Sequence, residues 1–241
     1  MIADRVAGLL RGLCLGDEAA RGSTDLGAVS RAVLASARRL CTDAVDGEAL
    51  RRGGDDEPDL VLAMAAPVAV MIAPRQHQTF DLVNAGWLDH LIGRTVGDGV
   101  APVDIDATGC VVHSLALRLL DVREPEALRS PDSWLTRPNP VDDLRSALRS
   151  GQRYAVAATA SDVLRTAADA FELVRTCSTV DEALGAVPGV PPTAAALAIG
   201  ILGAQHGASV LPPSASDATH EADALAALLL SLTLRDETRR P

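Results

Sequence analysis

Three glycines spaced four residues apart near the start of the chain constrain its fold more than any other feature. Apolar residues recur at helical spacing from Val6 to Leu13, which predicts a helix. Gly8, Gly12 and Gly16 lie on another face of that helix, where each costs about 1 kcal/mol against Ala. We therefore expect another backbone to pack very close to this helix. Gly12 and Gly200 should each face a neighbouring helix.

The rest of the chain has the composition of an all-α protein. Of its 241 residues 48% are hydrophobic and only 2% aromatic, and Ala and Leu, the best helix formers, dominate the apolar set. No stretch alternates over enough residues to require a strand. This length fits one large domain or two small ones. We predict a single helical domain over residues 1–241.

Helical spacing and Pro- or Gly-rich breaks together predict the order of elements along the chain. The segment Thr179–Glu182 has a capping-box pattern that begins a further helix. The other predicted helices are Thr24–Leu40, Leu60–Ala73 with a kink at Pro67, Phe80–Ile92, Ala107–Asp121, Val141–Ser150, Ser161–Val174, Thr193–His206 and Glu221–Leu234. The predicted loops are Arg51–Pro58, Gly93–Asp104, Pro131–Pro140, which is the best candidate for a linker, and Gly185–Pro192.

Charge and composition exclude several classes of function. The net charge is −10 and the isoelectric point about 4.9, which disfavours nucleic acid and anionic membranes as partners. All 22 basic residues are arginine, so no lysine can bind phosphate or form a Schiff base. The longest apolar run, Leu60–Ala73, is too short to span a bilayer, and the N-terminus has no signal-peptide pattern. We expect a cytoplasmic protein that does not enter the membrane.

The four cysteines form no metal-binding or redox motif. They are widely spaced and include no CxxC pair. We expect reduced thiols that pack as small buried hydrophobic residues. These are Cys14, Cys41, Cys110 and Cys177.

Two segments at opposite ends of the chain match the motifs of one family. The first, Arg5–Asp17, is similar to G-x-x-x-G-x-x-x-G-D-A in an opening helix. The second runs from Val180 through an Ala- and Gly-rich helix to Leu211-Pro212. On these motifs the chain resembles the ADP-ribosylglycohydrolase family. The resemblance implies an orthogonal bundle of about ten helices that hydrolyses N- or O-glycosidic bonds of ADP-ribose with two Mg²⁺ ions.

The chain departs from that family at the residues that bind metal. Counting back from Ala195 places residues 188–193 on the family's G-G-D-T-D-T, where Gly189 and Thr193 match. Val190 and Pro192 replace both aspartates, and their side chains cannot coordinate a cation.

A second acidic motif is also reduced. Thr24, Asp25 and Leu26 stand where the family has T-D-D, so Thr24 and Asp25 remain as metal ligands. Together they offer one negative charge against the four positive charges of two Mg²⁺ ions. We expect no dinuclear site and at best weak binding of one ion at Asp25.

The resemblance carries ligand binding to Asp17, Gly189 and Thr193, and two of them, Asp17 and Thr193, also have a structural alternative. Asp17 follows a glycine at an expected helix end, where the dipole disfavours it, so it either serves a pocket or makes a capping hydrogen bond. Thr193 is equally consistent with a helix N-cap. Asp25 is consistent with a favourable charge near a helix N-terminus.

Two further groups of polar residues are expected to be structural. Cys110 and His113 share one face of a predicted helix, but two ligands do not make a zinc site, so we expect core packing. We expect Asp98, Asp104 and Asp106 to lie in a solvated loop.

These observations favour a catalytically degenerate member of the family that acts as a binding or regulatory protein and holds no cofactor. ADP-ribose or a related nucleotide, or a protein partner, would be its ligand. The alternative is an active hydrolase with a rebuilt Mg²⁺ site, supplied by Asp17 or by carboxylates of the loop Asp98–Asp106. A purely structural or assembly role is a third hypothesis.

Overall fold

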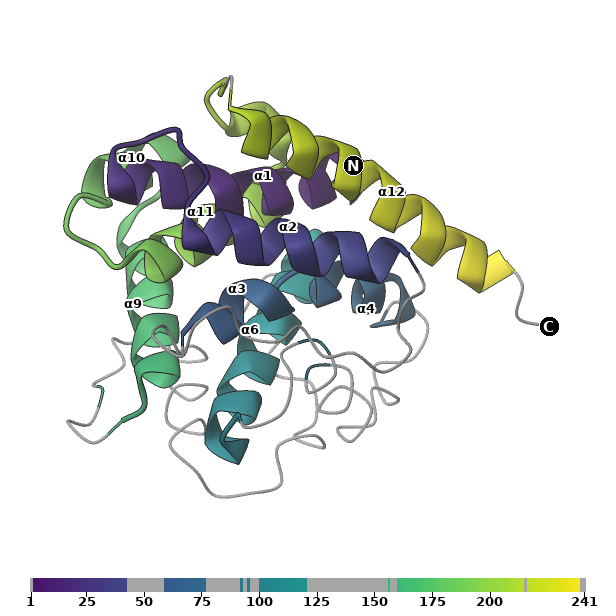
Figure 1. Cartoon of the computed structure of the whole chain (residues 1–241), viewed down its shortest axis with the longest axis horizontal. Coiled ribbons are helices and arrows are strands. Elements are labelled where there is room, and N and C mark those ends of the chain that lie inside the picture. Colours follow the sequence, from purple (N-terminus) through teal and green to yellow (C-terminus); the bar gives the residue numbers. More distant parts are fainter. Residues whose placement is uncertain are drawn as a thin grey trace.

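The computed structural model describes residues 2–42, 59–76, 92, 95, 100–120, 156, 160–214 and 216–238. Within these residues the protein consists of nine α-helices and one short 3-10 helix, without strands (Figure 1). The expected all-α class is therefore confirmed. The elements are α1 (Ile2–Arg21), α2 (Ala28–Cys41), α3 (Leu60–Ala65), α4 (Val68–Gln76), α6 (Pro102–Leu119), α9 (Asp162–Thr176), α10 (Val180–Ala186), α11 (Pro192–His206), η1 (Ala208–Val210) and α12 (Asp217–Thr238).

Helices α1 and α11 form an antiparallel pair at the centre of the molecule. A Cβ atom at Gly8 would lie 2.2 Å from the carbonyl oxygen of Gly203, and one at Gly16 would lie 2.6 Å from that of Ala195. The contact that comes later in α1 comes earlier in α11, so the two helices run in opposite directions. The two backbones therefore touch along about two turns, with glycine at the contacts.

The close approach expected at Gly12 and Gly200 is confirmed. A Cβ at Gly12 would lie 2.6 Å from the carbonyl oxygen of Ile199. One at Gly200 would lie 2.8 Å from Cγ of Leu13. Gly12 thus faces backbone, whereas Gly200 faces a side chain.

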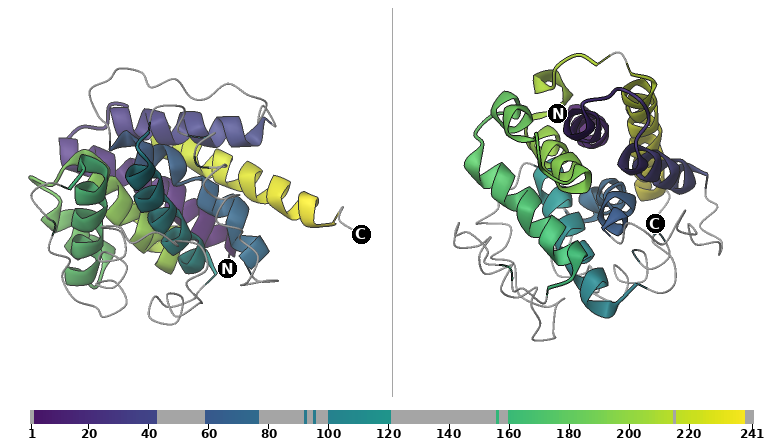
Figure 2. Two further views of the ribbon diagram at one scale, coloured as in Figure 1. Left: turned by 90° about the horizontal axis from the view of Figure 1, so that it is seen from below. Right: turned by 60° about the vertical axis from the view of Figure 1, so that its left-hand side comes forward.

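The remaining helices enclose this pair. Helices α2 and α12 pack against α1 and against each other, while α9, α10, α6 and α3 pack against α11 (Figure 2). Every residue of α11 from Thr193 to Ala204 is buried. One connected apolar core includes buried side chains from Val6 to Leu230.

The second helix begins later than the sequence predicted. It starts at Ala28 and not at Thr24, with Gly27 in extended conformation at its N-cap. Gly22 has φ 61°, a left-handed conformation that glycine adopts readily, and α1 ends one residue before it. Thr24 and Asp25 therefore lie in the connecting loop.

The predicted helix Leu60–Ala73 is divided in two. Helix α3 ends at Ala65 and α4 begins at Val68. Pro67 lies at the break, where it lacks the N–H that a continuous helix would use. The proline was predicted to kink the helix, and it separates two helices instead.

Helix ends account for the other differences. Helix α6 begins at Pro102, so Asp104 lies in its first turn rather than in a solvated loop, and Asp104 and Asp106 are half-buried. Helix α12 begins at Asp217, four residues before the predicted start. The capping box of Thr179 and Glu182 is confirmed.

Among the predicted segments, 80–91, 141–150, 51–58 and 131–140 lie outside the described residues, as does Asp98.

The cysteines are only partly as expected. Cys14 and Cys110 are buried, but Cys41 and Cys177 are half-buried, because both stand at helix C-termini where the core ends.

Within the described part of the chain, none of the helices combines the length and apolar character that a bilayer crossing requires.

Candidate functional site

Asp17 is a fully buried carboxylate with a complete set of partners. Its Oδ2 atom accepts hydrogen bonds from the backbone N of Ser30 at 3.0 Å and from the Ser30 Oγ at 2.6 Å. Its Oδ1 atom accepts from Nε of Arg21 at 2.9 Å. The Asp17 side chain is 0% exposed, while Arg21 is 25% exposed. The charge of Asp17 is thus neutralised by a cation from the next turn of its own helix.

These contacts make Asp17 the cap of another helix. Ser30 is the third residue of α2, and the N-cap residue Gly27 has no side chain to accept a bond there. A Cβ at Gly27 would lie 2.3 Å from Oδ2 of Asp17, so the carboxylate takes the space of the missing side chain. Of the two roles considered for Asp17, the structure shows the capping hydrogen bond. The expected helix end is wrong, since α1 continues to Arg21.

Arg21 also holds the loop between α1 and α2. Its guanidinium donates both to Asp17 and to the carbonyl oxygen of Asp25. The backbone N of Asp25 donates to Oγ of Ser23 at 3.1 Å. The main chain around the expected metal ligands is therefore organised around a guanidinium.

The two expected metal ligands lie at the surface. Thr24 and Asp25 are both exposed, and Asp25 precedes the first residue of α2 by three positions. Across the described ranges, no group of three or more His, Cys, Asp and Glu side chains is arranged to hold a metal ion. The absence of a cofactor remains a prediction.

Gly189 and Thr193 flank the start of α11. Gly189 has φ 90° in an exposed turn, in which the N of Val190 donates to the carbonyl oxygen of Val187 at 2.8 Å. Thr193 is buried, 3% exposed, as the second residue of α11. The predicted N-cap role of Thr193 is wrong, because Pro191 occupies the N-cap and the imide nitrogen of Pro192 fits the first helical position.

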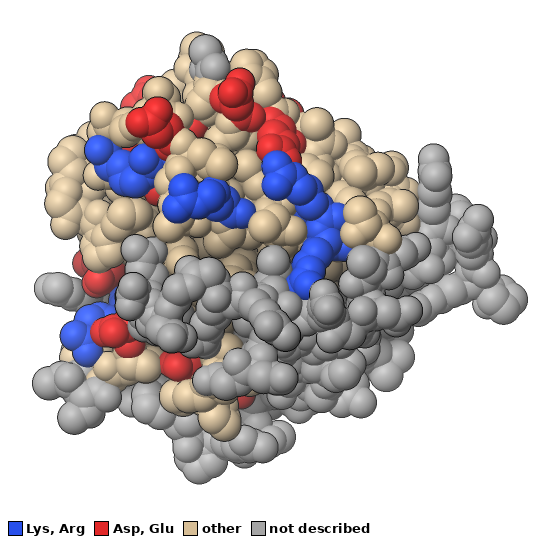
Figure 3. Space-filling view, in the orientation of Figure 1, with Lys and Arg blue, Asp and Glu red and all other residues tan. Residues whose placement is uncertain are grey.

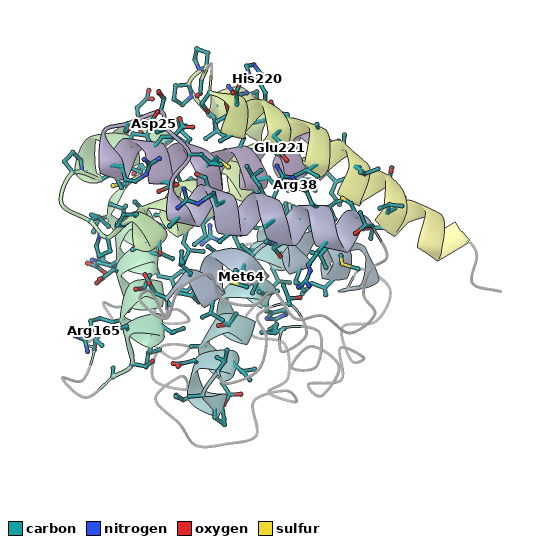
Figure 4. All side chains as sticks on the ribbon, viewed as in Figure 1. Asp25, Arg38, Met64, Arg165, His220 and Glu221 are labelled. Carbon is teal, nitrogen blue, oxygen red and sulfur yellow. The ribbon has the colours of Figure 1, made fainter. Side chains whose placement is uncertain are left out.

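The expected residues share one end of the central helix pair. Gly16 contacts the backbone of Ala195, so the C-terminal end of α1 lies beside the N-terminal end of α11. Figure 1 shows the α1–α2 loop and the α10–α11 turn on the same side of the molecule. Figure 4 shows Asp25 at this end. Asp17, however, is buried and bonded to α2, whereas Asp25 and Gly189 face solvent.

A second buried carboxylate was not predicted. Glu18 is 7% exposed, and it accepts hydrogen bonds from Oγ of Ser214 at 3.3 Å and from Oγ of Ser216. Ser216 caps α12, since its Oγ accepts from the N of Thr219 at 3.2 Å. Ser216-Asp217 before an apolar run is a recognisable helix start. The partnership with Glu18, 198 residues away, has no signal in the sequence.

Cys14 lies beside these carboxylates. The pKa of its thiol is raised to about 12, mainly by burial; a hydrogen bond from Ser30 lowers it, and the nearby charges of Glu18, Asp17 and Glu221 raise it. The thiol is therefore neutral at physiological pH and is a poor nucleophile. Each acid of this region has a structural partner: Asp17 caps α2, Glu18 binds Ser216, and Glu221 pairs with Arg38.

The other candidate groups lie on α6. Cys110 and His113 are 4% and 9% exposed, and they lie in the stretch of α6 from Ala107 to Leu119 in which every residue is buried.

No family model matches the chain, and no curated protein is found that resembles it in sequence. The resemblance to ADP-ribosylglycohydrolases therefore rests on the motifs in Arg5–Asp17 and Val180–Pro212.

Proposed function

We propose that this chain is a catalytically degenerate ADP-ribosylglycohydrolase-like protein that acts by binding a ligand or partner. One observation carries the proposal: both oxygens of the Asp17 carboxylate are engaged, one by the N-terminus of α2 and one by Arg21. An acid used in this way offers an oxygen to a metal only by giving up the α2 cap or the ion pair with Arg21.

The charges around this end of the molecule favour an anion over a divalent cation. The Arg21 guanidinium lies between Asp17 and the backbone of Asp25, so an Mg²⁺ ion placed there would be repelled. The N-termini of α2 and α11 add partial positive charge at the same end. Phosphate groups of ADP-ribose or a related nucleotide are anions of the kind that such an end attracts.

Calorimetric titration with Mg²⁺ and, separately, with ADP-ribose tests the proposal. We expect no stoichiometric Mg²⁺ binding, and ADP-ribose binding that does not depend on Mg²⁺. A panel of ADP-ribosylated substrates, incubated with and without Mg²⁺, should show no turnover.

The alternative, a hydrolase with a rebuilt site, has its own outcome. Binding of about two Mg²⁺ ions that Asp25→Ala abolishes and Asp217→Ala leaves intact would establish it. Asp217 is a suitable control because it is an exposed aspartate at the start of α12, outside the α1–α2 loop that contains Asp25.

A further inference from the structure

The outward face of α2 is basic in a chain whose net charge is −10. Arg31 and Arg38 are exposed and Arg39 is half-buried, and α2 contains no acidic residue. Figure 3 shows a row of basic side chains across the face that α2 occupies in Figure 1, with acidic side chains along its upper edge. Positive charge is therefore concentrated on this face, although the chain as a whole is negatively charged.

The cations of this face are spaced by two helical turns. Arg31 and Arg38 are seven residues apart, so they share one side of α2 and lie about 10 Å apart along its axis. Arg31 is held in place by a 2.7 Å hydrogen bond from its Nη1 to the carbonyl oxygen of Leu26. A guanidinium anchored in this way loses less conformational entropy when it binds an anion.

The side chains of Arg38 and Arg39 remain available to bind an anion. Arg38 pairs with Glu221 of α12, and the two lie together in Figure 4, yet the Arg38 side chain is 57% exposed. The carbonyl oxygen of Arg39 accepts from Thr42, but its guanidinium makes no hydrogen bond or ion pair within the described part of the chain. Planar guanidinium groups bind carboxylates through two parallel hydrogen bonds.

An exposed apolar side chain adjoins the row. Leu26 is 44% exposed, which makes it one of the four large apolar side chains exposed in the described structure. The backbone carbonyl oxygen of Leu26 accepts a hydrogen bond from Arg31, so the first cation is bound to the residue that carries this apolar group. A surface that combines cations with an apolar side chain fits an amphipathic acidic segment better than a partner that offers negative charge alone.

We propose that the α2 basic face, formed by Leu26, Arg31, Arg38 and Arg39, docks an acidic helical segment of a partner protein. The segment would present carboxylates two turns apart and one apolar residue beside the first carboxylate. Nucleic acid fits less well, because it carries one charge about every 1.7 Å along the duplex axis and would extend past this short row onto an acidic surface. The inference rests on the proposed function, since a protein that acts by binding needs a docking surface.

Fluorescence anisotropy tests the proposal with a labelled synthetic helical peptide of about five turns. The probe carries Glu residues seven apart and one Leu, and a second peptide has Gln at both Glu positions. The protein is used as the full chain, without Mg²⁺ or nucleotide, so the result does not depend on the turnover assay. Loss of peptide binding in this assay leaves the proposed function standing, whereas turnover of an ADP-ribosylated substrate would overturn the proposed function on which this inference rests.

The chain offers a matched control for Arg31. Arg165 is exposed, is also the fourth residue of its helix, and also donates to the carbonyl oxygen five positions earlier, at 2.8 Å to Ala160. Figure 4 shows it on α9, away from α2. Arg31→Glu and Arg165→Glu therefore lose the same local bond, and a glutamate near a helix N-terminus is favourable in both. Circular dichroism verifies that both variants are folded.

We expect Arg31→Glu to weaken binding of the Glu peptide by about fivefold or more, with Arg165→Glu unchanged. The Gln peptide should bind weakly, and 1 M salt, with a Debye length of about 3 Å, should abolish the difference between the peptides. Equal effects of the two variants, or equal binding of the two peptides, would overturn the proposal. Self-association of the chain that is lost in Arg31→Glu would also overturn it, because a second copy of the chain would then be the occupant. Tighter binding of single-stranded DNA or phosphatidylserine vesicles than of the Glu peptide at this face would overturn it as well.

Discussion

The carboxylate of Asp17 on α1 caps α2 by accepting the backbone N–H of Ser30 at 3.0 Å. Two helices are thereby joined through a buried polar contact at the point where the second one begins. The same carboxylate fills the space above Gly27. A residue that the family resemblance assigns to ligand binding thus has a structural role in the fold.

Asp17→Ala should destabilise the protein by about 2–4 kcal/mol. The substitution removes a charge-assisted cap and leaves the N–H of Ser30 buried without its acceptor, while Arg21 keeps access to water. Urea denaturation followed by circular dichroism measures the loss. Asp17→Asn, which retains one oxygen acceptor, should lose less. A variant as stable as the parent would show that the cap contributes nothing.

A double-mutant cycle with Gly27→Ala should show strong coupling to Asp17. A Cβ at Gly27 would lie 2.3 Å from Oδ2 of Asp17 and 2.4 Å from Nε of Arg21. Gly27→Ala should therefore cost about 1–3 kcal/mol in the parent and much less in the Asp17→Ala background. Additive losses would mean that the alanine is disfavoured for some other reason.

Gly12→Ala should be destabilising by about 1–3 kcal/mol or more, because the new methyl group meets the carbonyl oxygen of Ile199, a backbone atom that cannot rotate away. Gly200→Ala should cost less, since it meets the side chain of Leu13. Thermal melting compares them with Gly185→Ala. That helical position has nothing within 4 Å of a Cβ, so alanine should add about 0.5–1 kcal/mol of stability. The reverse ranking would contradict the antiparallel glycine contact.

His206 should make the fold less stable in mild acid. Its pKa is lowered from the usual 6.5 by burial and by the nearby charges of Arg118 and Arg5. Below pH 6.5 the unfolded chain therefore binds more protons at this site than the folded chain, and stability falls as the pH drops toward the folded pKa. Urea denaturation at pH 7.5 and pH 5 should show a smaller acid loss for His206→Gln than for the parent. An equal loss in both would assign the acid sensitivity to other groups.

Cys14 should resist alkylation in the native protein at pH 8. Its thiol is buried and has a pKa of about 12, so almost none of the reactive thiolate is present. The half-buried Cys41 and Cys177 should react first with iodoacetamide, and peptide mass spectrometry identifies the modified residue. In urea all four cysteines should react. Rapid native modification of Cys14 would show that this part of α1 opens to solvent.

The class of fold and its central contact could be predicted from the sequence. Helical spacing of apolar residues and the glycines of Arg5–Asp17 are local patterns, and they determine which face of α1 a neighbouring backbone can approach. The glycine pattern predicts that a neighbouring backbone lies close to Gly12, and the structure shows that this neighbour is α11. The capping box of Thr179 and Glu182 also lies within four residues, so the sequence alone reveals it.

The roles of the acidic residues were decided by tertiary structure. Asp17 and Glu18 are adjacent in sequence, but Asp17 caps α2 through Ser30, whereas Glu18 binds the hydroxyl of Ser216, the residue that caps α12. No local pattern specifies which helix end will lie above a given carboxylate, because that depends on how α2 and α12 pack against α1. The sequence by itself determined an all-helical protein with a close backbone contact at its glycines. Only the packing of the helices decided that Asp17 would be engaged as a cap, since the N–H groups of a helix end reach a carboxylate only once the two helices are in place.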